Sequence, residues 1–155
     1  MEQQDRYGMD QLDLWLDMKI HRGEEKMEKL HEKVRTDYLY HFAWSGEELY
    51  KVHYMTGKYR ELREVIRETQ KPEEVRDYIL QEREKCLREL VGGVIYTHYT
   101  NEIFNLAHSY KMECTQQLIQ DYNGFGQLLS MKPPHKEVEM KKAPETGKKS
   151  NGLKI

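Results

Sequence analysis

Apolar residues recur every three or four positions through two long stretches of the chain, one on each side of Pro72. This spacing places apolar side chains on one face of an α-helix and leaves Glu, Lys, Arg and Gln on the other. Pro72 is the only proline before Pro133, so few positions in these stretches disfavour helix. The pattern predicts an all-α protein, a bundle of about four long amphipathic helices over residues 1–131, followed by a flexible, disordered tail over residues 132–155 that contains lysine and proline.

The first predicted helix begins near Met9 and contains a glycine. Gly23 falls within an apolar series that keeps its steps of four and three on both sides of the glycine. A glycine in a helix interior costs only about 1 kcal/mol relative to alanine. We therefore expect a helix that runs through Gly23, straight or mildly kinked, rather than two helices.

Residues 45–48 have the sequence of a capping box, in which a serine and a glutamate satisfy backbone amides at a helix start. Ser45 and Glu48 are the two members, and Trp44 and Leu49 occupy the hydrophobic-staple positions around them. These signals predict a helix start at Gly46. The preceding segment, residues 38–44, is apolar nearly all round, which is typical of a helix end buried by neighbours or by a partner.

Pro72 and several glycines mark the remaining boundaries. One helix should end near Gln70, and the next should begin at Pro72, where a missing amide hydrogen is tolerated. Gly92-Gly93 predicts a kink or a short turn, after which the helical pattern resumes at once through Ile95, Tyr99, Ile103, Leu106, Tyr110 and Cys114 to Tyr122. Asn123-Gly124 and Gly126 then predict the end of the last helix.

Charge is distributed unevenly along the chain. The net charge is −2, but the residues from Met131 onward carry seven lysines and three glutamates, a balance of +4, so the preceding residues carry −6. An acidic body is a poor match for a nucleic-acid backbone. The tail carries positive charge, which suits a nucleic-acid backbone. One alternative is therefore that the tail contacts nucleic acid, and the other is that it is a solubilising terminus. The tail lysines concerned are Lys136, Lys141, Lys142, Lys148 and Lys149.

The sequence contains no complete motif for binding a metal or a cofactor. Glu28 and His31 form one Glu-x-x-His pair, whereas a di-iron bundle needs two such pairs and two further glutamates. Cys86 and Cys114 are isolated, and no secretory signal or membrane span is recognised. We therefore expect no metal, no cofactor and no membrane contact, and a cytoplasmic protein with reduced thiols.

Arg35 and His41 are separated by five residues. This spacing resembles the Arg–His signature of the HEPN-family ribonucleases, which are small all-α domains acting as dimers. The resemblance implies a metal-independent ribonuclease in which Arg35 steadies phosphate charge and His41 assists proton transfer. The family usually has Asn, Asp or His directly after the arginine, where this chain has Thr36. The alternative is a surface arginine and a half-buried histidine near a helix end.

The chain is rich in tyrosine, a side chain that suits partly wet recognition surfaces. Together with the paired apolar seams, this favours a helical protein–protein interaction module without catalytic activity: an adaptor, an inhibitor or an assembly component, including such proteins encoded by phages or mobile elements. Heptad-like seams of the coiled-coil type also predict a homo-oligomer. The predicted partner-binding residues are Tyr38, Tyr40, Phe42, Trp44, Tyr96, Tyr99 and Tyr110.

Overall fold

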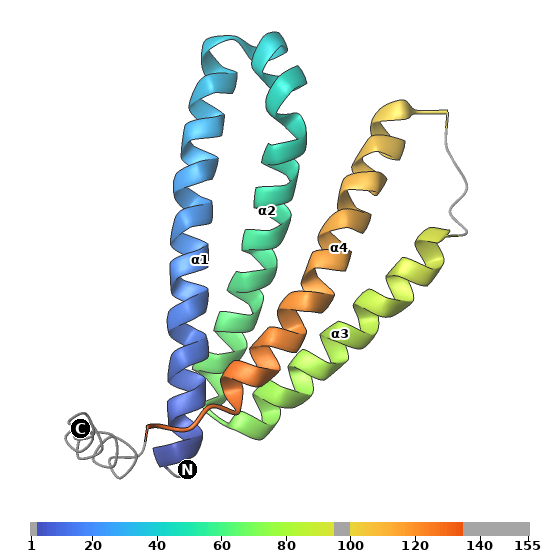
Figure 1. Cartoon of the computed structure of the whole chain (residues 1–155). Helices are drawn as coiled ribbons and strands as arrows, with labels where there is room; N and C mark the ends of the chain where they lie inside the picture. Colours follow the sequence, from blue (N-terminus) through green and yellow to red (C-terminus); the bar gives the residue numbers. More distant parts are fainter. Residues whose placement is uncertain (1–2, 95–99, 135–155) are drawn as a thin grey trace, which may run out of the picture.

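The computed structural model describes residues 3–94 and 100–134, and these two ranges contain four helices (Figure 1). The helices are α1 (Gln3–Thr36), α2 (Tyr38–Thr69), α3 (Pro72–Val94) and α4 (Glu102–Leu129). The described residues contain no β-strand, which confirms the predicted all-α bundle. The tail predicted from residue 132 onward lies almost entirely outside the described residues.

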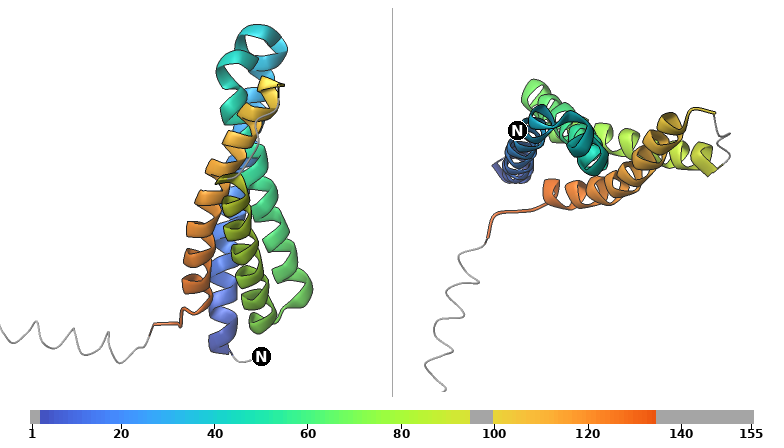
Figure 2. Two further views of the ribbon diagram at one scale, coloured as in Figure 1. Left: turned by 90° about the vertical axis from the view of Figure 1, so that its right-hand side faces the viewer. Right: turned by 90° about the horizontal axis from the view of Figure 1, so that it is seen from above.

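The four helices form two antiparallel hairpins, α1–α2 and α3–α4 (Figure 1). At one end, here called the closed end, the hairpins meet; it holds the start of α1, the link from α2 to α3 and the end of α4. Toward the other end, the splayed end, the α3–α4 hairpin leads away from the α1–α2 hairpin. Figure 2 shows this divergence from above.

The hydrophobic core lies toward the closed end. Its largest rings belong to three helices: Trp15 on α1 contacts Tyr59 on α2 and Phe125 on α4, with ring centroids 5.8 Å and 5.1 Å apart. These rings meet edge to face, an arrangement that aromatic pairs favour. The other buried core side chains are Met9, Leu12, Leu16, Ile20, Leu62, Ile66, Val75, Ile79, Cys86, Leu118, Tyr122 and Leu129.

Helix α1 runs without interruption through Gly23, as the spacing predicts. A Cβ atom at Gly23 would overlap the hydroxyl oxygen of Thr56 on α2 and lie 3.2 Å from its Cβ. Thr56 is buried, so it cannot move aside freely. The glycine is therefore the residue that lets α1 and α2 approach closely here. Gly8 plays the same part against the backbone carbonyl of Leu129 at the end of α4.

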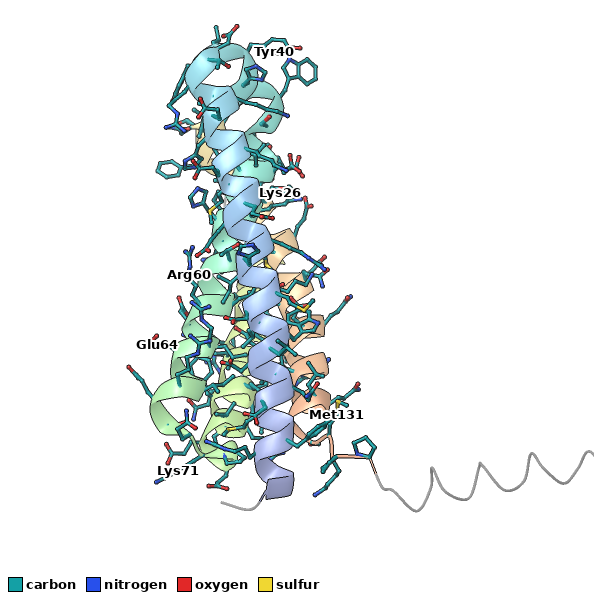
Figure 3. The ribbon with its side chains drawn as sticks, turned by 90° about the vertical axis from the view of Figure 1, so that its left-hand side faces the viewer. Lys26, Tyr40, Arg60, Glu64, Lys71 and Met131 are labelled. Atoms are coloured by element: carbon teal, nitrogen blue, oxygen red, sulfur yellow. The ribbon has the colours of Figure 1, made fainter. Side chains whose placement is uncertain are left out.

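Ion pairs align α1 with α2 along their length. Three arginines of α2 reach acidic side chains of α1: Arg60 to Glu24 at 2.7 Å, Arg63 to Asp17 at 2.7 Å, and Arg67 to Asp13 and Asp17 at 3.1 and 3.2 Å. Figure 3 views α1 from outside and labels Arg60. Hydrogen bonds from these arginines lower the pKa of Asp17 and of Glu24. Such exposed pairs contribute roughly 0–1 kcal/mol each to the free energy of unfolding. Their main effect is therefore to set the register of α1 against α2.

The predicted helix start at Gly46 is wrong. Helix α2 begins at Tyr38, where the Asp37 side chain accepts a hydrogen bond from the Tyr40 amide at 3.3 Å. The capping-box residues therefore lie inside α2, where backbone amides already bond within the helix. Glu48 instead forms an ion pair with Lys26 of α1, at 2.7 Å.

The boundary around Pro72 is confirmed. Gln70 adopts a left-handed conformation (φ 56°), and its amide donates to the Ile66 carbonyl at 3.0 Å to close α2. Helix α3 begins at Pro72, with Glu73 and Glu74 in its first turn, where negative charge suits the helix dipole.

Gly92-Gly93, Gly124 and Gly126 lie within helices. Helix α3 passes through Gly92-Gly93 and ends at Val94, so the predicted short turn does not occur at these two glycines. Helix α4 begins at Glu102, capped by the Asn101 side chain; residues 95–99, where the helical pattern was predicted to resume, lie outside the described part. The predicted stop at Gly124 and Gly126 is also wrong, because α4 continues to Leu129 and buries Phe125 and Leu129 in the core.

Candidate functional site

A groove of about 660 Å³ opens between the N-terminal halves of α2 and α4, on the splayed side of the core. Its walls are mainly apolar and aromatic. The lining residues are Phe42, Ala43, Gly46, Glu47, Leu49, Tyr50, His53 and Tyr54 from α2, and Ile103, Leu106, Ala107 and Tyr110 from α4. A concave apolar site with a few polar groups is the usual form of a binding site in proteins.

The groove exists because the apolar stripe of α4 is longer than the core. Cys114 and Leu118 on this stripe are buried. The same stripe continues through Tyr110 to Leu106 and Ile103, yet Leu106 is 52% exposed and Ile103 is 72% exposed. The hairpins diverge along this stretch (Figures 1 and 2), so the stripe loses its neighbours as it leaves the core.

Three tyrosines cross the groove from one helix to the other. The rings of Tyr54 and Tyr50 stack with centroids 6.1 Å apart, and Tyr50 meets Tyr110 of α4 at 6.0 Å. Burial, with a smaller effect from Glu89, raises the pKa of Tyr54 to about 12. Burial also raises the pKa of Tyr50. These phenols stay neutral at physiological pH and act as hydrogen-bonding groups within an apolar wall.

Lys51 ties α2 to α4 at the border of the groove. Its ammonium group pairs with Glu47 one turn away on α2, at 2.6 Å, and with Glu113 on α4. It also lies 5.7 Å from the centre of the Tyr110 ring, within the range of a cation–π contact. Hydrogen bonds to the two glutamates raise the pKa of Lys51, so this link persists through the physiological range.

The α4 wall of the groove and the start of α2 contain no Asp, Glu, Lys or Arg. Residues 38–44, here called the tip, contain no Asp, Glu, Lys or Arg, and neither do residues 103–110 at the start of α4. Across the whole chain, these four residue types make up 34% of positions. Charge depletion of this kind distinguishes the centre of a protein–protein interface from ordinary surface.

A histidine pair borders the groove on its α1 side. Nε2 of His31 on α1 lies 2.9 Å from Nε2 of His53 on α2, and the two rings stack. A hydrogen bond between these atoms requires one of them to be unprotonated. Burial, followed by the nearby charge of His31, lowers the pKa of His53. A smaller cavity of about 370 Å³ adjoins the groove here and shares Phe42 and Leu49 with it.

The predicted partner-binding residues fall into three groups. Phe42 and Tyr110 line the groove, and Tyr38 lines the smaller cavity. Tyr40 and Trp44 line neither cavity; they project from the tip, with their rings 6.4 Å apart. Tyr96 and Tyr99 lie outside the described residues.

The partner-binding residues predicted from the sequence include only Phe42 and Tyr110 of the groove lining; Tyr50, Tyr54, Ile103 and Leu106 are among the lining residues that were missed. The tyrosines were visible as a cluster on adjacent turns of one helix. Ile103 and Leu106 continue the spacing of the core stripe, so the pattern treats them as core. One sequence signal could have distinguished Ile103 and Leu106 from core residues. The residues around them carry no charge, whereas the solvated end of a helix usually carries charged side chains.

Arg35 and His41, the pair that resembles the ribonuclease signature, lie on consecutive helices with the cap Asp37 between them. The Arg35 guanidinium donates a hydrogen bond to Glu32 at 2.9 Å and borders the smaller cavity. The His41 ring contacts Tyr40 edge-on at 5.1 Å and is not among the residues that line this cavity. The ribonuclease role stays a prediction. The five tail lysines lie outside the described residues.

Metal-ligating residues do not converge in the described part of the chain. No group of three or more His, Cys, Asp or Glu side chains there could hold a metal ion. Cys86 and Cys114 are buried and free, and burial raises the pKa of both thiols, which keeps them protonated and unreactive.

None of the helices within residues 3–94 and 100–134 is long and apolar enough to cross a membrane. Comparison of the chain with protein-family models, with curated proteins and with solved structures finds no match. Function is therefore inferred from geometry and chemistry alone.

Proposed function

We propose that this protein is a non-catalytic helical interaction module that binds an apolar helical segment of a protein in the groove between α2 and α4. The observation that carries the proposal is the α4 stripe, which leaves the core and stays exposed at Leu106 and Ile103. Exposed apolar surface that is contiguous with a groove marks an interaction site more often than scattered exposed residues do.

A helix is the occupant that fits this groove best. Ile103, Leu106 and Tyr110 follow the i, i+3, i+7 spacing of a helix face, and they stand opposite a second helix face on α2. An amphipathic helix laid between them would restore the packing that the core has at the closed end, the mode known as helix-in-groove recognition. The uncharged α4 wall favours apolar side chains on the docked face, since an unpaired charge there would lose its hydration.

The groove also supplies polar groups that orient an occupant. Tyr50 and Tyr54 line the groove, and their neutral hydroxyls can donate and accept hydrogen bonds. Such a mixture of apolar anchors and a few polar groups gives specificity without requiring a charged ligand.

Photo-crosslinking from inside the groove tests the proposal. A benzophenone amino acid at Leu106 should form adducts with a protein under native conditions, whereas the same amino acid at Leu80 should not. Leu80 is the matched control, because it lies on α3 and is 56% exposed, close to the 52% of Leu106. Adding Ile103→Lys to the Leu106 photo-variant should abolish the adduct without changing helix content by circular dichroism. Equal adducts from both positions, or none from Leu106, would contradict the proposal.

A further inference from the structure

We infer that the occupant of the groove is the tip of a second copy of this chain, so that two copies form a reciprocal dimer in which each tip fills the other copy's groove. This inference rests on the proposed function. Residues 38–44 form the tip, the first two turns of α2 after the α1–α2 turn. Figure 1 shows the α1–α2 hairpin projecting beyond the start of α4.

The tip has the properties of an interface anchor. Leu39 is 78% exposed and Trp44 is 77% exposed, although both lie in a helix that is continuous with the core. Tyr40 stands beside Trp44 on the helix face that does not line the groove of its own copy. Trp and Tyr are the residues that most often anchor protein interfaces. The tip of one copy is thus available to enter a groove that its own copy cannot fill.

The exposed area matches the needs of a stable dimer. Seven large apolar side chains of the tip and the groove are 45% to 78% exposed: Tyr38, Leu39, Tyr40, Phe42, Trp44, Ile103 and Leu106. At roughly 200 Å² for each fully exposed side chain, they offer on the order of 900 Å² per copy. Specific interfaces bury about 800 Å² on each partner.

The charge pattern favours a second copy over a transient partner. Both the tip and the α4 wall of the groove lack Asp, Glu, Lys and Arg. Interfaces that form only transiently are about as polar as the rest of a protein surface, whereas homodimer interfaces are more apolar.

The chemistry of the two surfaces is complementary. The groove holds three tyrosines in contact, Tyr50 stacked on Tyr54 and tilted against Tyr110, and these rings can receive other aromatic rings edge to face. Their hydroxyls can accept from the indole N–H of Trp44, which would otherwise lose a water partner on burial. A twofold arrangement uses each tip and each groove once and closes at two copies, with no open surface to propagate a filament.

Sedimentation velocity of the full chain at about 1 to 100 µM tests the inference, a range chosen to span ordinary dimer affinities. We expect a dimer of twice 18.7 kDa that dissociates on dilution. Trp44→Ala in the tip and Ile103→Lys in the groove should each weaken it at least about tenfold. Leu80→Lys is the matched control and should leave it unchanged. A chain of 18.7 kDa at every concentration would overturn the inference.

Mixing the two variants tests the reciprocal geometry. In a mixed dimer of the Trp44→Ala and Ile103→Lys chains, one tip–groove contact contains both substitutions and the other contains neither. A contact already broken by one substitution loses little more to the second, so the mixture should form dimer at concentrations where each variant alone is monomeric. No gain on mixing would show that the copies associate by another surface and would overturn the inference.

The crosslinking experiment separates failure of this inference from failure of the proposed function. A Leu106 adduct with the mass of two chains supports both. A monomeric chain whose Leu106 position captures a different protein, and whose capture is lost with Ile103→Lys, overturns the inference and leaves the proposed function standing. A monomeric chain with no Leu106 adduct overturns both.

Discussion

The hydroxyl of Tyr59 on α2 donates a hydrogen bond of 2.7 Å to the carboxylate of Asp121 on α4. Eight residues earlier on each helix, Lys51 reaches Glu113. Both links join residues 62 positions apart, so α2 and α4 run parallel in a single register between the core and the groove. Lys51 and Glu113 lie beside lining residues of the groove, so this link holds α2 and α4 together at the border of the groove.

Tyr59→Phe should lower the free energy of unfolding by about 1–2 kcal/mol, because it removes a nearly buried hydrogen bond to a charged group. The loss should stay moderate, since Asp121 also accepts from Gln117 at 3.0 Å. Urea unfolding followed by circular dichroism measures the change. Tyr40→Phe, at an exposed position on the tip, is the control and should change stability little. Equal stability of the wild-type and Tyr59→Phe chains would show that this bond does not fasten α2 to α4.

Gly23 and Gly57 should respond oppositely to alanine. Gly57 lies in α2 with open space around its Cα, so Gly57→Ala should stabilise the protein by about 0.5–1 kcal/mol through helix propensity. Gly23→Ala places a methyl group against buried Thr56 and should destabilise it by about 1–3 kcal/mol. Thermal or urea unfolding of both variants measures the two signs.

The double variant Gly23→Ala with Thr56→Ala identifies the cause of the Gly23 effect. Thr56→Ala removes the hydroxyl and methyl groups that the new Cβ would meet. The double variant should therefore be less destabilised than the two single changes added together. Additive losses would mean that the close approach of α1 and α2 does not set the requirement for glycine.

The periodicity of apolar residues was enough to predict the helical bundle, the continuity of α1 and the boundary at Pro72, because each depends on local backbone preference and face. The helix start at Gly46 failed for a tertiary reason. A capping box needs a non-helical residue at its serine, but Asp37 already caps α2 and Lys26 of α1 engages Glu48. A local sequence motif contains no information about such a competing contact from another helix.

The groove could not be predicted from periodicity. The spacing of apolar residues shows which face of a helix is apolar, but it does not show over what length of that face a neighbouring helix packs. Ile103 and Leu118 occupy the same stripe of α4, yet Leu118 is buried and Ile103 is exposed. The difference arises from the divergence of two hairpins, a property of the whole bundle.

Leu118 and Ile103 should therefore differ in their contribution to stability. Leu118→Ala should cost about 2–5 kcal/mol, since it leaves a cavity in a packed core. Ile103→Ala should change the free energy of unfolding by no more than about 0.5 kcal/mol, as at other exposed positions. The comparison is made by urea unfolding at low protein concentration, where association does not contribute. A loss of several kcal/mol at Ile103 would indicate that the groove is closed in the single chain.

Acid should destabilise the fold through His53. Its pKa in the folded protein lies below the ordinary value of 6.5, mainly through burial and then through His31 on α1 and Arg60 on its own helix. Between the lowered pKa and 6.5 the unfolded chain binds more protons, so the contribution of His53 to stability is present above pH 6.5 and is lost as the pH falls through that window.

His53→Gln should reduce this pH dependence, because glutamine can keep a hydrogen bond to His31 but does not titrate. Urea midpoints between about pH 7.5 and about pH 5, the range in which histidine changes charge, measure the slope. His21→Gln is the control: that side chain is 73% exposed on α1 and pairs along its own helix with Glu25, so its loss should leave the slope in place. If the His53→Gln and wild-type chains lose stability in parallel on acidification, the stacked histidine pair is not the group that responds to acid.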